Sequence, residues 1–479
     1  MFSSTLLLIV ISYVLLYVSW VHVIIPTFLS PLSKIPNAHW SASFNPFWML
    51  WVRWRERENR TIHAAHVKHG NIVRLGPKEV SVSSVDDGIR VIYGGGFEKW
   101  PWYENQFNNF GVPCMFSMSR SKPHSARKRM ISNIYSKSYL QSSPEVHTIA
   151  KVVIFDRLLP RLASLSSKQE AVDVLHMHMS STMDMVTAFL FGLGNGSNFI
   201  QDLKAGQEWF TIYQSRRPFR FWDGELPWMK TLSKKLGFPL SPPFVAEATN
   251  WIETWVTERC QAAQTWTRSV KEQPTDEPRT PAIVFDHLTN TVSGTAEDKS
   301  LGPPNLQIAS EVQDHLAAGH ETSGIALTYL YWELSRHPAL QASLREELLT
   351  LSPPLKLPAN KADPGLLSPR AVDSLPLLHA ILMETLRIHA SIPGPQPRLT
   401  PYPPVSVAGS PPLDPGIRIS TQPYSLHRNA DVFPDPEVWK PARWLEPNEK
   451  KKAEMMKWFW AFGSGGRMCI GSHLAMQGL

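Results

Sequence analysis

A cysteine near the end of the chain stands in a loop suited to presenting a sulfur ligand to a metal. Cys469 lies in the run Phe462-Gly463-Ser464-Gly465-Gly466-Arg467-Met468-Cys469-Ile470-Gly471. Glycines let the backbone turn tightly and approach a flat ligand closely. Backbone N–H groups of such a loop can hydrogen-bond a thiolate and hold its charge. Because a lone cysteine is more often an inert packing residue, the interpretation depends on the rest of the chain.

A second candidate group lies in the middle of a long predicted helix. Apolar periodicity predicts a helix over Asn305–Arg336, about 45 Å long. Its centre reads Ala317-Ala318-Gly319-His320-Glu321-Thr322, where small residues leave room for a flat cofactor and for dioxygen. A carboxylate beside a hydroxyl can relay protons into a dry site. Taken alone, the motif fits an ordinary helix with polar residues facing solvent, and His320 is expected to be a spacer.

Two further motifs place opposite charges near each other. Glu384 and Arg387 lie three residues apart, on one face of a helix predicted over Leu377–Ile388. Such a pair is common on exposed helices and is weak alone. It gains weight from Pro441-Ala442-Arg443-Trp444 downstream.

These motifs, in this order, resemble those of the cytochrome P450 family. The resemblance implies that Cys469 is the axial ligand of a haem iron, a ligation that favours O–O cleavage. It also implies that Glu321 and Thr322 are the acid and alcohol of oxygen activation. Glu384, Arg387 and Arg443 would form a structural charge network behind the haem loop, without a catalytic role.

Haem carries two propionates, which require cationic partners. The resemblance assigns Arg467 to them first, and then Arg398, which follows the run Pro393-Gly394-Pro395-Gln396-Pro397. The family often has Trp and Arg four residues apart on an early basic helix, and here His124 and Lys128 stand at that spacing. The expected cofactor contacts are therefore Arg467, Arg398, His124, Lys128, Phe462 and Gly463.

Composition excludes several classes of protein. Apolar residues make up 43% and charged residues 19%, which is not a disordered composition. The net charge is +7, but no Lys/Arg run forms a nucleic-acid stripe, so a face toward anionic lipid or an acidic partner fits better. Three scattered cysteines give no disulfide framework and indicate a reducing compartment.

The N-terminus predicts a retained membrane anchor. Residues 1–33 contain no Lys, Arg, Asp or Glu, and the apolar stretch Leu6–Ile25 is long enough to cross a bilayer. A signal peptide would have a basic start and small residues at a cleavage site. Basic residues from Lys34 onward favour a cytosolic body. We therefore expect a transmembrane anchor (1–25), a proline-containing hinge (26–45) and a haem-thiolate monooxygenase domain (46–479).

The predicted fold is mostly α with small β-sheets, the cytochrome P450 fold, preceded by one N-terminal transmembrane helix. Short strands are expected in Asn71–Ser83, Val405–Val407 and Ile417–Ile419. Three tryptophans, Trp48, Trp51 and Trp54, share roughly one helical face, which fits either a helix packed on the body or an interfacial belt beside the bilayer.

The C-terminus departs from the family pattern. Ten residues follow Cys469, whereas family members continue with a full helix and a terminal β-hairpin, so the C-terminal end is expected to be missing. Between residues 141 and 302 the resemblance rests on order and length only. Substrate is therefore the least readable feature.

The resulting prediction is a membrane-anchored haem-thiolate monooxygenase that inserts one oxygen atom of O2 into an apolar small molecule. It would contain haem b and lie in the endoplasmic reticulum membrane as a single-pass protein with a cytosolic catalytic domain. Because the chain has no flavin or nicotinamide fingerprint, its partner would be the NADPH-cytochrome P450 reductase. Membrane lipid is a further partner and nucleic acid is not. Terpenoid or polyketide-type secondary metabolites fit as substrates. Two alternatives stay open: a thiolate-haem isomerase or dehydratase, and a truncated non-catalytic membrane protein.

Overall fold

The structure, a computed structural model, describes residues 2–272, 280–292, 301–352 and 368–479. The chain divides into two compact units. Unit 1 comprises Met1–Trp100, Ile392–Glu437 and Ala453–Met468, and unit 2 comprises Pro101–Ser391, Val438–Lys452 and Cys469–Leu479. Both units are therefore assembled from segments that lie far apart in the sequence.

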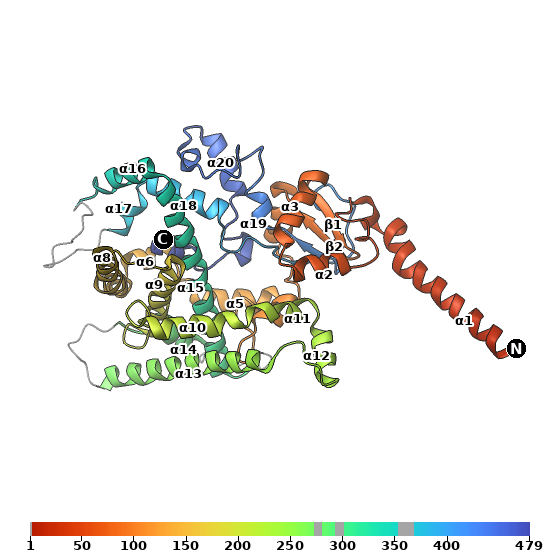
Figure 1. The fold of residues 1–479 in the computed structure, drawn as a ribbon, viewed down its shortest axis with the longest axis horizontal. Helices are drawn as coiled ribbons and strands as arrows, with labels where there is room; N and C mark the ends of the chain where they lie inside the picture. Colours follow the sequence, from red (N-terminus) through yellow and green to blue (C-terminus); the bar gives the residue numbers. More distant parts are fainter. Residues whose placement is uncertain (1, 273–279, 293–300, 353–367) are drawn as a thin grey trace. The chain divides into compact units, whose positions relative to one another are not determined.

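Unit 1 contains the N-terminal helix and a small sheet covered by short helices (Figure 1). Its elements are α1 (Phe2–Ser19), η1 (Trp20–Leu29), η2 (Pro31–Lys34), α2 (Phe47–Trp54), α3 (Glu58–His69), β1 (Ile72–Gly76), β2 (Glu79–Val82), η3 (Val85–Gly94), β3 (Arg398–Leu399), β4 (Arg418–Ser420), α19 (Pro423–Leu426) and η8 (Gly465–Arg467). Helix α20 (Glu449–Trp458) carries the chain from unit 2 into unit 1.

The sheet has the strand order β1-β2-β4-β3. Strands β1 and β2 are antiparallel, which confirms the strand pair predicted in Asn71–Ser83. Strand β4 pairs parallel to β2 and antiparallel to β3, one residue beyond the predicted Ile417–Ile419. The strand predicted at Val405–Val407 is wrong. Only an isolated bridge forms there, between Val405 and Leu413, because nearby prolines remove ladder donors.

The N-terminal helical stretch of unit 1 is apolar and exposed. Among the described residues, Thr5–Leu29 is the one stretch long and apolar enough to cross a membrane. The segment predicted as a hinge, 26–45, packs on the unit itself, since Leu32 and Ile35 belong to a buried cluster with sheet residues such as Val80. The proposed domain boundaries stay a prediction.

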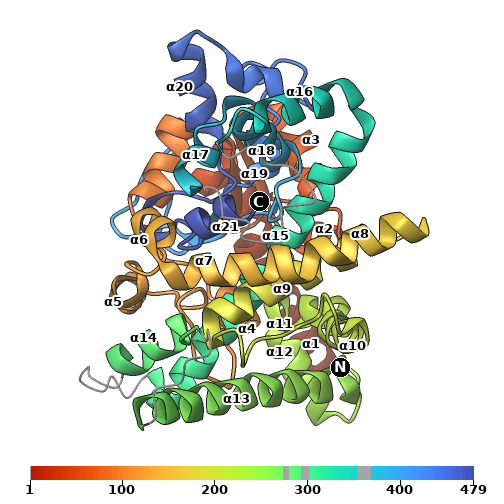
Figure 2. The ribbon, with the colours of Figure 1, turned by 90° about the vertical axis from the view of Figure 1, so that its left-hand side faces the viewer.

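Unit 2 is helical among its described residues (Figures 1 and 2). Its first half contains α4 (Trp102–Phe107), α5 (Ser121–Ile131), α6 (Lys137–Ser142), α7 (Pro144–Ala150), η4 (Lys151–Leu158), α8 (Leu159–Lys168), α9 (Val174–Phe191), α10 (Leu203–Ser215), η5 (Arg217–Phe219), α11 (Arg220–Glu225) and α12 (Pro227–Lys235). Its second half contains α13 (Pro243–Glu272), α14 (Ile283–Val292), α15 (Pro304–Arg336), α16 (Pro338–Leu348), α17 (Pro369–Asp373), α18 (Pro376–Ile388), η7 (Pro441–Leu445) and α21 (Ser472–Gly478).

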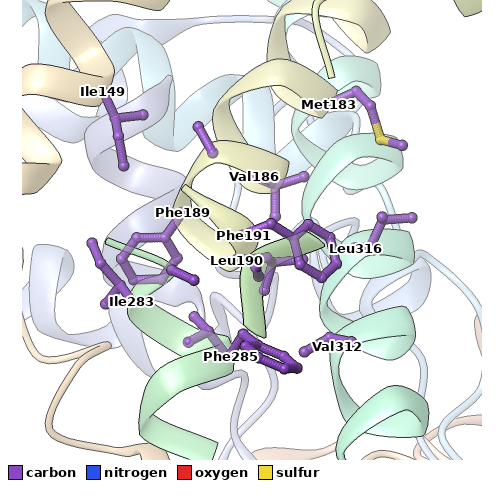
Figure 3. Close-up of a cluster of buried hydrophobic side chains, with 14 of the residues drawn as sticks. Ile149, Met183, Val186, Phe189, Leu190, Phe191, Ile283, Phe285, Val312 and Leu316 are labelled. Carbon is purple, nitrogen blue, oxygen red and sulfur yellow. The ribbon is translucent and has the colours of Figure 1, made fainter. Parts of the chain in front are cut away.

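Helix α15 is the central element of unit 2. It packs along α9 and also contacts α13, α14, α18 and α21. The core at this contact is apolar: side chains from α7, α9, α14 and α15 meet in one cluster that includes Val186, Phe189, Phe285, Val312 and Leu316 (Figure 3). The predicted helices Asn305–Arg336 and Leu377–Ile388 are both confirmed, each beginning one residue earlier.

Helices α9 and α15 lie in close contact at Gly319 of α15. A Cβ on Gly319 would lie 2.6 Å from Cγ2 of Val186 on α9. Because valine is stiff at χ1 in a helix, this neighbour cannot move aside cheaply. The glycine of the central motif is therefore required by packing.

We predict that Gly319→Ala lowers the free energy of unfolding by about 1–3 kcal/mol, since overpacking outweighs the gain in helix propensity. Denaturant titration followed by circular dichroism measures the shift. Gly194→Ala is the matched control, because a Cβ there meets no atom within 4 Å. Equal stability of the two variants would contradict the packing argument.

Candidate functional site

The loop before Cys469 requires its glycines. Gly463 and Gly465 both have φ +69°, in the left-handed region. A Cβ on Gly465 would also lie 2.2 Å from the carbonyl oxygen of Tyr93. Within unit 1 the loop therefore approaches η3 so closely that only glycine fits. Phe462 and Gly463 lie in this loop, and their contact with a cofactor stays a prediction.

Cys469 begins the last segment of unit 2, and its side chain is exposed. Protein around the thiol still displaces enough water to raise its pKa. The backbone N–H of Gly471 and the charge of Lys128 lower that pKa, and the Asp314 carboxylate raises it, so the net shift is upward. A metal that took the sulfur as ligand would have to displace its proton.

The centre of α15 carries small side chains, Ala317, Ala318 and Gly319. Ala318 is exposed, although most residues of the preceding turns are buried. The Thr322 hydroxyl donates to the Ala318 carbonyl at 2.7 Å, one turn back. The helix remains α-helical throughout, so this bond orients the hydroxyl without breaking the ladder.

Glu321 points to a partner that the sequence did not indicate. Its Oε1 lies 3.5 Å from Nη1 of Arg217, in the turn that follows α10. Arg217 is 68% exposed and Glu321 24%, so the pair lies between the helix and solvent. An exposed pair of this kind is weak and easily exchanged. The carboxylate can therefore take protons from the solvent side.

His320, the residue before Glu321, is buried against aromatic rings of α10. Ring centroids of Trp209, Phe210 and Tyr213 lie 5.1, 5.8 and 5.3 Å from its own. Its Nδ1 bonds the Leu316 carbonyl at 2.7 Å, and burial lowers its pKa. His320 is thus a core residue, as the sequence-based expectation of a non-ligand requires.

The structure brings Glu384, Arg387 and Arg443 together in unit 2. Glu384 and Arg387 are fully buried, and Arg387 donates to both carboxylate oxygens of Glu384 at 2.8 Å. Nε of Arg443 lies 2.9 Å from Oε1 of Glu384. The carboxylate also accepts from the Lys440 backbone N–H and from the Trp444 indole, each at 2.9 Å. The spacing of Glu384 and Arg387 in the sequence did not reveal these last two donors.

The surroundings of Glu384 favour its ionised form. Burial raises its pKa, but the hydrogen bond and charge of Arg387, followed by the charge of Arg443, outweigh burial and hold the pKa below its usual value. Glu384 therefore joins α18 to η7 by charge-assisted bonds inside the unit. The structural role assigned to the three residues stays a prediction.

Candidate partners for propionates fall into both units. In unit 1, Arg398 and Lys99 are buried and face each other across an isolated bridge. Nη2 of Arg467 lies 3.3 Å from Oε2 of Glu98. In unit 2, His124 is buried, and Lys128 is close enough to act on Cys469. The sequence analysis did not name Lys99, because a single lysine forms no motif with its neighbours in the chain.

A buried polar network on α15 also escaped the sequence analysis. Glu311 pairs with Arg127 at 3.2 Å, and both side chains are almost wholly buried. His315, one turn later, lies 3.4 Å from Glu311 and bonds the Tyr135 hydroxyl at 2.8 Å. The i, i+4 spacing of Glu311 and His315 is visible in the sequence. Their partners, Arg127 and Tyr135, lie far away in the chain, and no spacing pattern points to them. Arg127 is therefore engaged within the protein.

The residues present fit a haem group. A haem needs a sulfur or nitrogen ligand to iron, a wall of small side chains, and cations for its propionates. Cys469 offers an exposed sulfur with a backbone N–H partner in Gly471. In the same unit, Ala318 provides an exposed small side chain, and Lys128 provides a cation close enough to act on the sulfur.

Comparisons with known proteins agree with this assignment. The family model "Cytochrome P450" matches residues 42–479. Cytochrome P450 monooxygenase avaI of Aspergillus versicolor is 29% identical over 429 residues, which cover 86% of this chain and 93% of the relative. Cytochrome P450 monooxygenase stcB of Emericella nidulans is 26% identical, with 93% of this chain and 80% of the relative covered. N-acetyltryptophan 6-hydroxylase ivoC, also of Emericella nidulans, is 26% identical over 93% of this chain and 83% of its own length.

We predict that Glu384→Gln lowers the free energy of unfolding by about 3–5 kcal/mol, since it leaves two buried arginines without a counter-charge. Guanidinium titration measures the loss. Glu454→Gln is the matched control, because the pair of Glu454 with Lys457 is exposed and contributes little.

The same carboxylate predicts a pH dependence. Because its folded pKa is lowered, its stabilisation is present above the unfolded value of about 4.3 and is lost as pH falls through the folded value. The stability difference between wild type and Glu384→Gln should therefore shrink under acid conditions. A difference that is constant with pH would contradict an ionised Glu384.

Proposed function

The chain belongs to the cytochrome P450 family and is a monooxygenase, and from this premise we propose that Cys469 binds the iron of haem b and that the enzyme hydroxylates an apolar small molecule of fungal secondary metabolism. One atom of O2 would enter the substrate and the other would leave as water, with two electrons and two protons supplied. The observation that carries the proposal is the exposed Cys469 thiol in a glycine-dependent loop.

The haem, when bound, supplies the activation of dioxygen, and the residues of α15 supply its protons. The hydroxyl of Thr322 is oriented by the Ala318 carbonyl and can accept a proton from one side. Glu321, at the solvent-facing pair with Arg217, can collect protons from water. Glu321 would thus supply protons and the neighbouring Thr322 hydroxyl would accept them.

The proposed substrate class rests on the names and organisms of the similar proteins. One relative is by its name a hydroxylase of N-acetyltryptophan, and the others are named as fungal monooxygenases. A terpenoid or polyketide-type substrate fits this setting. The family uses a redox partner, for which we propose the NADPH-cytochrome P450 reductase. The apolar stretch Thr5–Leu29 supports anchoring in the endoplasmic reticulum membrane, with the body in the cytosol.

The thiolate assignment has a spectroscopic test. We expect the reduced, carbon monoxide-bound protein to show the thiolate-haem absorption band, and Cys469→Ser to lose it. Cys260→Ser is the matched control, because burial raises the pKa of Cys260 to about 12 and makes it an inert packing residue. Retention of the band in Cys469→Ser, or its loss in Cys260→Ser, would contradict the proposed ligand.

The proton route has a kinetic test. Thr322→Ala should reduce product formed per NADPH by about 10- to 100-fold and divert reducing equivalents to peroxide, since a hydroxyl positioned to relay protons is lost. Thr328→Ala is the matched control, because Thr328 makes the same kind of bond to the carbonyl one turn back, further along α15. Full coupling in Thr322→Ala would contradict the role of this hydroxyl. Product formation without NADPH would favour the isomerase alternative.

A further inference from the structure

Helices α2 and α3 of unit 1 (Figure 1) contact each other, and a hollow lies between them. Its volume is about 630 Å³, within the range of about 300–1,000 Å³ that is usual for small-molecule sites. Ala38 and Trp48 form one side, and the other side comes from α3 and the residue that precedes it. The hollow therefore lies within a single unit and has room for one small molecule.

Both ends of the hollow are basic. Arg57 and Arg60 line it at the N-terminal end of α3, and Lys68 and His69 line it at the C-terminal end. Among the described residues that line it, none is an aspartate or a glutamate. Arg57, Arg60 and Lys68 also form no ion pair with any residue that the structure describes. Unpaired cations around a concave surface concentrate anions from solution.

The carboxylates nearest in sequence do not neutralise the N-terminal end of the hollow. Oε1 of Glu58 lies 2.8 Å from Nε of Arg53 and is engaged there, and Glu56 is exposed outside the lining. The Arg57 side chain does not cap α3, so the first N–H groups of this helix add to the positive field. Two guanidinium groups beside a helix N-terminus suit a phosphate, which arginine can bind through two parallel N–H···O bonds.

The middle of the hollow is shaped for a flat, uncharged group. Thr61, Ala64 and Ala65 of α3 give it a floor of small side chains between the two basic ends. The facing side is the indole of Trp48, whose ring lies parallel to that of His39 within 6°, with centroids 4.9 Å apart. Trp48 also packs against the buried cluster that joins α2, α3 and β1. The indole is therefore held in place before any ligand arrives, which favours binding.

We propose that this hollow binds a soluble organic phosphate that carries a planar ring, with the size of a nucleotide. The phosphate lies between Arg57 and Arg60, and the ring lies between the alanine floor and the Trp48 indole. Lys68 follows Arg60 by eight residues, about 12 Å along an α-helix, and it marks the far end of the ligand. A lipid headgroup would fill the basic end alone and leave the floor and the indole uncovered.

The test is equilibrium dialysis of adenosine diphosphate against the full-length haem protein in a neutral detergent. We expect one saturable site. Inorganic phosphate and adenosine should each compete about tenfold more weakly or worse, because each of them fills only one part of the hollow. Competition by phosphate as strong as that by adenosine diphosphate would overturn the assignment of the ring.

A charge variant tests the phosphate end. Arg57→Gln combined with Arg60→Gln should weaken binding of adenosine diphosphate by about tenfold or more, since charge-assisted bonds to the phosphate are lost. Lys34→Gln combined with Lys78→Gln is the matched control, because it changes the net charge equally at exposed positions of unit 1 outside the hollow. Equal weakening in the two double variants would overturn the site.

A filling variant tests the floor. Ala64→Leu should abolish binding by occupying the space above the floor, and it should fold, because Ala64 is exposed. Val67→Leu is the matched control, since Val67 is 75% exposed on the same helix and lies outside the lining. Unchanged binding in Ala64→Leu would overturn the placement of the ring.

Two further outcomes would assign the hollow to another ligand. Loss of adenosine diphosphate binding when the protein is moved from phosphatidylcholine nanodiscs to nanodiscs with phosphatidylserine would assign it to a lipid headgroup. Competition by oligoglutamate as strong as that by the nucleotide would assign it to acidic peptides. Either result would overturn the inference and leave the proposed monooxygenase function untouched, since that function is tested separately by the carbon monoxide band.

Discussion

The buried carboxylate of Glu384 joins segments of unit 2 that lie far apart in the sequence. It accepts bonds from Arg387 on its own helix and from Lys440, Arg443 and Trp444, which lie beyond a long excursion of the chain through unit 1. Removing a carboxylate from water is expensive, and its attraction to the two arginines repays this only because nearly every acceptor direction is used. The segment that returns from unit 1 is therefore placed by directional charged bonds, whereas apolar contact alone would tolerate a shift in register.

The surroundings of the Cys469 thiol bear directly on its proposed role as a ligand of iron. The protein around it favours the neutral thiol, in spite of the N–H of Gly471 and the charge of Lys128. A strongly charged iron would reverse that balance, because coordination replaces the proton. Asp314 adds a carboxylate that disfavours the thiolate further. In its proposed role, the thiol would need the metal to ionise it, which would restrict its reactivity toward other electrophiles.

Local features of this fold could be predicted from sequence, and remote pairings could not. The periodicity of Asn305–Arg336 and the turn between β1 and β2 depend on neighbouring residues, so helix α15 and the hairpin were predicted almost to the residue. The strand predicted at Val405–Val407 was wrong because the prediction used the alternation of apolar and polar residues and ignored the prolines around it. The partners of Glu321 and Glu311, Arg217 and Arg127, lie on other helices. No pattern within one helix specifies which other helix will lie against it, so such partners appear only when the tertiary packing is known.

Arg74 in unit 1 and Glu384 in unit 2 play similar parts with opposite charges. Both are fully buried charged groups, and each is satisfied largely by groups from segments distant in sequence. In unit 1 the guanidinium gathers carbonyl oxygens from the end of the apolar N-terminal stretch, from the turn before α2 and from the β1–β2 turn. A hydrophobic side chain at position 74 could fill the same volume, but it would leave those carbonyls without donors and the apolar stretch without a fixed exit. For the proposed membrane anchor, a rigid junction would convert the direction of one helix into the orientation of the whole of unit 1. The same side chain also holds the turn that leads into α2, through the Ser43 carbonyl.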